Sequence, residues 1–351
     1  MAAILDITPE NAWVALGRRL QQDRAGAISL AIVALYLFMI LLAAVGYLAG
    51  GWSEEVGVPY ANPAFLGDRP NLEAALAQRA KRQRGHVPDL SAVDPLAPKY
   101  GEWEKRTEQL KTTQRERTLT LPWGGDQFGR DVLAKAIKGS QVSIAVGVFA
   151  ALFATLIGTL LGALAGFYGR WVSDFLEWVY NVFTSIPTIL LVFALAAVLR
   201  SGPLGQVFAS GIWMVVIILA VTGWTGMYRL VRAEYMKHRS REYVLAAQAI
   251  GASAASRMFV HILPNVSHVI LVQLSLLVVA FIKVEVILSF LGLGVPIDMV
   301  SWGTMLAEAQ TELIIGKWWQ LAAATVFMAI FLTAFSMLTD SLRDALDPKL
   351  R

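Results

Sequence analysis

The chain has 351 residues, with 30 Lys and Arg against 26 Asp and Glu, a formal net charge of +4, and no cysteine. Apolar residues make up 56% and charged residues 16% of the chain, whereas soluble domains average about 45–50% and about 25%. Together with a mean hydropathy of +0.55, these values exclude an ordinary soluble enzyme and indicate an integral membrane protein. The lack of cysteine excludes disulfides, thiolate catalysis, cysteine zinc sites and iron–sulfur clusters.

Long apolar stretches predict an all-α protein with six transmembrane helices. A helix needs about 20 apolar residues to cross about 30 Å of hydrocarbon. The first span is expected at 27–50. The other five fall within a core at 139–339, and they lie at 139–169, 177–200, 204–228, 265–282 and 317–340. Pro187 lies inside the third of these stretches.

Basic residues predict the orientation of the chain. Residues 229–265 form a short, Arg-rich loop, and such loops face the cytoplasm. With six spans, both termini then lie on the same side. We therefore expect a cytoplasmic amphipathic N-terminus at 1–26, in which Trp13, Leu16 and Leu20 recur at helical spacing, and a cytoplasmic C-terminus at 340–351.

The polar stretch 51–138, between the first two spans, is expected to be external. It exceeds the length of about 60 residues over which the charge rule applies, so its own charges say little about its side. Two polar helices are expected within it, at 71–85 and at 102–117, joined by a proline-containing connector. The insert is either a solvated helical region or a docking surface for an external partner.

Motifs for catalysis or nucleotide binding are missing from the sequence. It contains no phosphate-binding GxxxxGK[ST] loop, no GxSxG and no HExxH. His238, His261 and His268 are scattered and fit loop or interface positions better than a metal site. We expect no enzymatic activity, no cofactor, no metal and no nucleic-acid partner.

The stretch 241–265 predicts a helix–turn–helix that projects from the membrane. A short helix ends at Gly251, because glycine tolerates the left-handed conformation that reverses the chain. A second helix is expected at 253–261, and Pro264 is expected to start the fifth span. The small side chains of Ala246 and Ala247 would let the backbone of a partner approach, with Ala247 facing that partner's groove.

This stretch resembles the "EAA" coupling loop of ATP-binding-cassette importer permeases. Leu245, Ala246 and Ala247 take the first three motif positions, Gly251 the glycine, and Leu263 with Pro264 the end of the motif. Two positions depart from the pattern, since Leu245 replaces the acidic residue and His261 replaces an isoleucine. Glu242 lies nearly one turn before the missing carboxylate. The resemblance assigns contact with the ATPase subunits to these residues.

Three further stretches narrow the resemblance to the C subunits of dipeptide/oligopeptide permeases, at 124–147, 289–310 and 340–351. It implies a type I importer permease fold in a bacterial inner membrane. It also implies a heterodimer with a homologous permease, two cytoplasmic ATPase subunits that bind ATP and Mg²⁺, and an external solute-binding protein. The insert at 54–119 is longer than the family's usual segment, and the resemblance does not explain it.

The outer loop 286–316 predicts a re-entrant scoop, because its apolar run is interrupted by Gly292 and Gly294. Lys283 and Glu285 lie beside it in an apolar stretch, where charges are candidates for a pathway or gate. The alternative is structural, with Lys283 reaching outward and Glu285 holding the glycine turn. Asp126, Arg130 and Asp131, which precede the second span, are expected to fix the start of that helix.

These observations predict the permease subunit of an importer for peptides or related small solutes. Nickel, glutathione or another solute stays open as the cargo. Two other classes remain, namely a stand-alone channel or secondary carrier, and a membrane assembly protein that binds a partner without transport.

Overall fold

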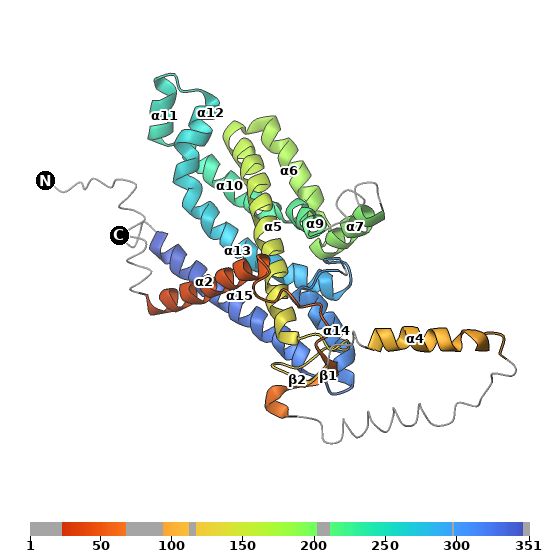
Figure 1. The fold of residues 1–351 in the computed structure, drawn as a ribbon. Coiled ribbons are helices and arrows are strands. Elements are labelled where there is room, and N and C mark those ends of the chain that lie inside the picture. Colours follow the sequence, from red (N-terminus) through yellow and green to blue (C-terminus); the bar gives the residue numbers. More distant parts are fainter. Residues whose placement is uncertain (1–22, 68–93, 112–116, 202–210, 297, 347–351) are drawn as a thin grey trace.

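The computed structural model describes residues 23–67, 94–111, 117–201, 211–296 and 298–346 (Figure 1). The predicted helices at 71–85 and in the N-terminus 1–22, and the end of the C-terminus at 347–351, lie outside these ranges. The described part is almost entirely helical, and this confirms the predicted all-α class.

Four helices in the described residues are long and apolar enough to cross a membrane, and two bent helix pairs bring the number of spans to as many as six. The four are α2 (Arg24–Ala44), α5 (Val132–Tyr168), α13 (Leu263–Phe290), which continues a helical run from Ala254, and α15 (Trp319–Leu346). The predicted count of six is therefore confirmed, with each bent pair taken as one span.

Several predicted boundaries were wrong. The first span ends at Ala44 and not at residue 50, shortly before Gly46 adopts a φ of 80°. The second begins at Val132, inside the predicted insert, because Asp131 caps its N-terminus. The fifth reaches Phe290 and not residue 282, so the first residues of the predicted scoop belong to α13.

The third span is sharply broken and not straight. Helix α6 (Arg170–Ser185) and helix α7 (Thr188–Ser201) are bent by 91° on either side of Pro187. Proline lacks an amide hydrogen and forces the preceding residue out of the helical region, and Ile186 is extended, with φ −95° and ψ 130°. The sequence located this proline, but the size of the bend depends on tertiary packing.

The fourth span is also bent, by 43° between α9 (Trp213–Gly223) and α10 (Thr225–His238). Its helix extends ten residues beyond the predicted end, and α10 packs along α5 (Figure 1). Three glycines of α5 permit this contact. A Cβ atom on Gly158, Gly162 or Gly166 would lie 2.6–2.7 Å from a backbone carbonyl oxygen of the fourth span, which faces α5. Small residues at this spacing let membrane helices approach closely.

The stretch between the first two spans contains a parallel two-stranded sheet that the sequence did not predict. Strand β1 (Gly57–Pro63) pairs with strand β2 (Thr118–Leu121) across a long stretch of chain. Both strands are short, and β1 contains proline, so neither shows a clear alternating pattern. Between them lie two short 3₁₀ turns, η1 (Ala64–Leu66) and η2 (Ala97–Lys99), and helix α4 (Tyr100–Lys111), which confirms the second predicted polar helix; residues 112–116 of that prediction lie outside the described residues.

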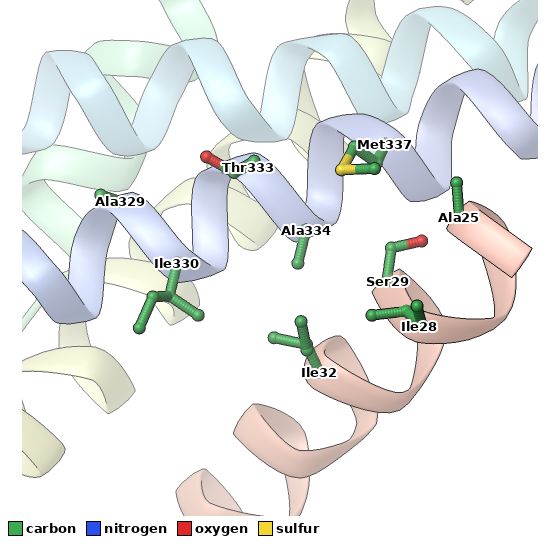
Figure 2. Close-up of a pocket in the computed structure, with 9 residues that line it drawn as sticks. All are labelled: Ala25, Ile28, Ser29, Ile32, Ala329, Ile330, Thr333, Ala334 and Met337. Atoms are coloured by element: carbon green, nitrogen blue, oxygen red, sulfur yellow. The ribbon is translucent and has the colours of Figure 1, made fainter.

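Helices α2 and α15 lie side by side, and an apolar pocket of about 400 Å³ opens between them (Figure 2). The pocket lining carries no charged side chain; it comprises Ala25, Ile28, Ser29, Ile32, Ala329, Ile330, Thr333, Ala334 and Met337. Next to the pocket, Ser341 Oγ donates a hydrogen bond of 2.6 Å to Asp23 Oδ2. Asp23 also caps α2, so this bond joins the start of the first span to the end of the last.

Candidate functional site

The predicted projection at 241–265 is present, and we call it the knuckle. Its first helix, α11, runs over Glu242–Ala249. Gly251 follows with a φ of +89°, and no atom lies within 4 Å of where its Cβ would be. The backbone conformation, and not space, therefore demands glycine here. The predicted end of the first short helix is confirmed.

The second half of the knuckle differs from its prediction. Ser253 caps a single turn, α12 (Ala254–Ser256), which passes through a π-helical turn, η3 (Arg257–Ile262), directly into α13. The second short helix and the fifth span are thus one continuous helix, and Pro264 does not start a new one. A wide turn just before Pro264 accommodates its missing amide hydrogen without ending the helix.

The buried side of α11 is not the one expected from the sequence. Val244 and Ala247 are buried, and they face the body of the protein; Val244 shares a core with Met258 and Ile262. Ala247 therefore does not face a partner, and that prediction was wrong. Leu245 and Ala246 are exposed, and Ile250 is 86% exposed at the tip. An apolar tip made of Leu245, Ala246 and Ile250 is the surface that the knuckle offers.

The other predicted coupling residues lie around this tip. Glu242 is exposed at the start of α11, and Pro264 is exposed on the continuing helix. His261 and Leu263 are half-buried between them. The structure thus gathers the motif residues on one projection, with only Ala247 turned inward.

Three side chains hold the knuckle, and the residues just before it, against the spans. The sequence analysis counted Arg239 and Arg257 only as positive charge and did not single out Tyr235. Tyr235 Oη donates to the Met258 carbonyl over 3.1 Å, and an Arg239 guanidinium nitrogen donates to the Gly166 carbonyl at the end of α5 over 3.3 Å. Arg257 donates to Gln248 Oε1 over 2.5 Å and lies 5.3 Å from the centre of the Phe167 ring. These contacts join the knuckle and the end of α10 to α5.

The predicted scoop is a tight turn followed by helix α14 (Trp302–Ile314). Glu285 is fully buried and accepts a 2.6 Å hydrogen bond from Ser289 Oγ, which in turn accepts one of 3.3 Å from the Val295 amide. A Cβ on Gly294 would lie 1.9 Å from Ser289 Oγ, and Gly292 has a φ of +77°. Glu285 is thus placed to hold the turn through Ser289.

Beyond the scoop, the outer ends of α5, α14 and α15 meet at an ion cluster that the sequence did not reveal. Lys135 is buried, and its Nζ lies 2.8 Å from Asp126 Oδ2, 2.5 Å from Glu308 Oε2 and 3.4 Å from Gln320 Oε1. Arg130 Nε donates to Asp126 over 2.7 Å. We call these five residues the outer cluster. In sequence they are up to about half the chain apart, and no short motif links them.

Asp126 and Asp131 do what was predicted of them. Asp126 Oδ1 accepts from the Phe128 and Arg130 amides, both at 2.9 Å, and Asp131 caps α5 through the Leu133 amide. Burial acts to raise the pKa of Asp126, but Lys135 and Arg130 outweigh it, so the net pKa is lowered.

Glu312 borders the outer cluster on α14, which is not one of the candidate spans. Its Oε1 accepts from the Gln127 amide over 3.2 Å, and the residue is 1% exposed. Burial raises the pKa of Glu312 to about 7; nearby Lys135 opposes this effect, and the carboxylates of Asp126 and Glu308 reinforce it. This carboxyl therefore titrates near neutral pH.

Comparison with known proteins identifies the family of the chain. The family model for the binding-protein-dependent transport system inner membrane component matches residues 158–351, which include the whole knuckle and the scoop. The chain belongs to this family. It is a multi-pass inner-membrane permease subunit of an ATP-binding-cassette importer, which works with ATPase and binding-protein partners.

Individual relatives agree with this membership. The oligopeptide transport system permease protein OppC of Bacillus subtilis is 34% identical over 256 residues, which cover 73% of this chain and 81% of the relative. The dipeptide transport system permease protein DppC of the same organism is 38% identical over 229 residues, which cover 65% and 69%. The glutathione transport system permease protein GsiD of Pectobacterium atrosepticum is 36% identical over 230 residues, which cover 65% and 72%.

The permease subunit shows no metal centre in its described part, where no group of three or more His, Cys, Asp or Glu side chains is placed to hold an ion.

Proposed function

We propose that this subunit forms half of the translocation pathway of a peptide importer and transmits the ATPase cycle through the knuckle. Support for the peptide cargo comes from the names of the oligopeptide and dipeptide relatives. Glutathione, itself a tripeptide-like solute, is the second candidate, because a relative of similar identity bears that name. Nickel remains a less supported cargo, and a stand-alone carrier or channel is disfavoured by the family.

The proposed complex contains a homologous permease, two cytoplasmic ATPase subunits and an external solute-binding protein, with ATP and Mg²⁺ bound by the ATPases. In this arrangement the knuckle and both termini are cytoplasmic, and the outer cluster faces outward. Support for opposite sides comes from Figure 1, in which α11 and α12 lie at one end of the molecule and β1, β2 and α14 at the other. The external insert then lies where a binding protein docks.

The single observation that carries this proposal is the apolar tip of the knuckle. Leu245, Ala246 and Ile250 are exposed on a projection whose base is hydrogen-bonded to α5 and α10. Exposed apolar groups on a rigid projection mark a protein-binding site. When the ATPases close, they would move α11, and the contacts of Arg239 and Tyr235 would carry this movement into the spans.

Reconstitution tests the proposed cargo. The chain is produced with the permease, ATPases and binding protein of its own importer, and uptake of trialanine and of glutathione is measured in proteoliposomes with ATP inside. We expect ATP-dependent uptake of trialanine. Uptake of glutathione alone would select the second candidate, and uptake that needs a proton gradient but no ATP would contradict both.

A further inference from the structure

One face of α13 points away from the body of this subunit and carries a charge. Phe281 and Ile282 point inward, since Gly223 and Gly147 make room for them: a Cβ there would lie 2.2 Å from Phe281 and 2.3 Å from Ile282. Glu285 also points inward. Lys283 lies on the opposite face and is exposed, and it makes no hydrogen bond or ion pair with any residue that the structure describes.

The surroundings of Lys283 on this face are apolar in both directions along the helix. Leu276 and Ala280 precede it, and Ile287 and Phe290 follow it, all of them exposed. Lys283 lies seven residues before the end of α13, and a rise of 1.5 Å per residue places its Cα about 10 Å from that end. The charge is therefore not at the edge of the apolar surface.

The direction of the side chain argues against an escape to the nearer membrane surface. Side chains on a helix lean toward its N-terminus, and the N-terminus of this helical run lies at the knuckle. This lean would direct the ammonium of Lys283 toward the knuckle end of the helix and away from the near end of α13. A lysine that faces lipid at the middle of a membrane helix costs about 2.5–3.5 kcal/mol, and such residues usually face a water-filled path or a counter-charge.

We propose that Lys283 lines the solute path and binds the terminal carboxylate of the peptide as it passes. The assignment rests on the proposed function, because it needs a cargo with a free carboxylate and a second permease that closes the path over this face. An ammonium suits this task, since its three donors are not fixed in one plane and can meet carboxylates that arrive at different angles.

The absence of cysteine from the chain permits a direct test at this position. Lys283→Cys is assembled with cysteine-free partner subunits and treated with aminoethyl methanethiosulfonate, which restores an ammonium, or with the sulfonatoethyl reagent, which adds a negative charge. Only a thiolate in contact with water reacts quickly. Leu37→Cys, on the exposed face of the first span, is the matched control for a thiol that faces lipid.

The proposal predicts three results. The thiol at 283 reacts at least about tenfold faster than the thiol at 37, as expected for a wet path. Lys283→Met lowers the rate of trialanine uptake by about tenfold or more, the loss expected for one charge-assisted hydrogen bond, while Lys283→Arg keeps most of it. In Lys283→Cys, the aminoethyl reagent restores uptake and the sulfonatoethyl reagent does not.

Four other results would overturn it. Equal reactivity at 283 and 37 would place the lysine in lipid. Loss of the second permease from purified Lys283→Met would make Lys283 part of an ion pair between subunits. Unchanged trialanine uptake by Lys283→Met, beside normal uptake by the unmodified importer, would remove Lys283 from the path and leave the peptide function standing. Absence of trialanine uptake by the unmodified importer would instead overturn the peptide function itself, and this assignment with it.

Discussion

Lys135 and Asp126 form a buried ion pair of 2.8 Å at the point where α5 begins, and both side chains are 0–1% exposed. Glu308 of α14 and Gln320 of α15 share the same ammonium. A single side chain thus joins three segments that come together only in the folded protein.

Loss of that ammonium should destabilise the outer end of the protein. Lys135→Met removes the buried ammonium between the carboxylates of Asp126 and Glu308 and leaves them Arg130 alone. Removing one partner of a buried pair in this way costs about 3–5 kcal/mol. We expect a marked fall in melting temperature in detergent. Lys237→Met is the control, because Lys237 pairs with Glu234 at the surface and such pairs contribute about 0–1 kcal/mol. Equal melting temperatures for the two variants would contradict this role.

The outer cluster also shows where sequence reasoning stops. Spans, caps and the Gly251 turn depend on residues close together in the chain, and these were predicted; Asp131 and Gly251 lie where local rules place them. The cluster, the pairing of β1 with β2 and the inward side of Ala247 depend on contacts between distant segments. The eight residues of α11 could bury either of two faces. Contact with the helical segment that leads into α13 determines which face is buried.

Titration of Glu312 should make the stability of the outer end depend on pH. Its pKa is raised from 4.5 to about 7 in the folded protein, so between these values the folded state binds more protons than the unfolded state. Stability therefore falls as the pH rises from about 4.5 to 7 and stays lower above pH 7. Melting temperatures from pH 5 to 8 check this, and Glu312→Gln should flatten the slope. An unchanged slope in the variant would show that Glu312 does not titrate in this range.

Glu285 should be replaceable by a residue that still accepts a hydrogen bond. Glu285→Gln keeps an acceptor for the Ser289 hydroxyl proton, whereas Glu285→Leu leaves that buried hydroxyl with the Val295 amide as donor but without an acceptor, at a cost of about 1–3 kcal/mol. We expect normal assembly for the first variant and reduced assembly for the second, measured by co-purification of the second permease. If both variants assemble but neither supports uptake, Glu285 belongs to the pathway and not to the turn.

The topology of the chain can be tested by the same labelling of introduced cysteines. Ser253 caps the second part of the knuckle and Glu104 is exposed on α4, so the proposed orientation places them on opposite sides of the membrane. Glu104→Cys should react with an impermeant thiol reagent added to intact spheroplasts, and Ser253→Cys should react only after lysis. Reaction of both before lysis would refute the proposed sidedness.

We propose that the knuckle couples ATP hydrolysis to transport, and substitutions at its exposed tip measure this coupling most directly. Ala246→Trp adds bulk at an exposed position, and Gly251→Val forces a β-branched residue into a φ of +89°, which costs about 1–3 kcal/mol of local strain. Both residues lie outside the spans, so insertion should be normal. Ala247, by contrast, is buried, so Ala247→Trp should lower the yield of folded protein.

The measurement is binding-protein-stimulated ATP hydrolysis of the reconstituted importer, together with the amount of ATPase subunit that co-purifies with each variant. We expect Ala246→Trp and Gly251→Val to insert at normal levels but to lose either the ATPases or the stimulation. Wild-type retention and wild-type stimulation in both variants would contradict it, because force would then reach the spans by a route other than the knuckle.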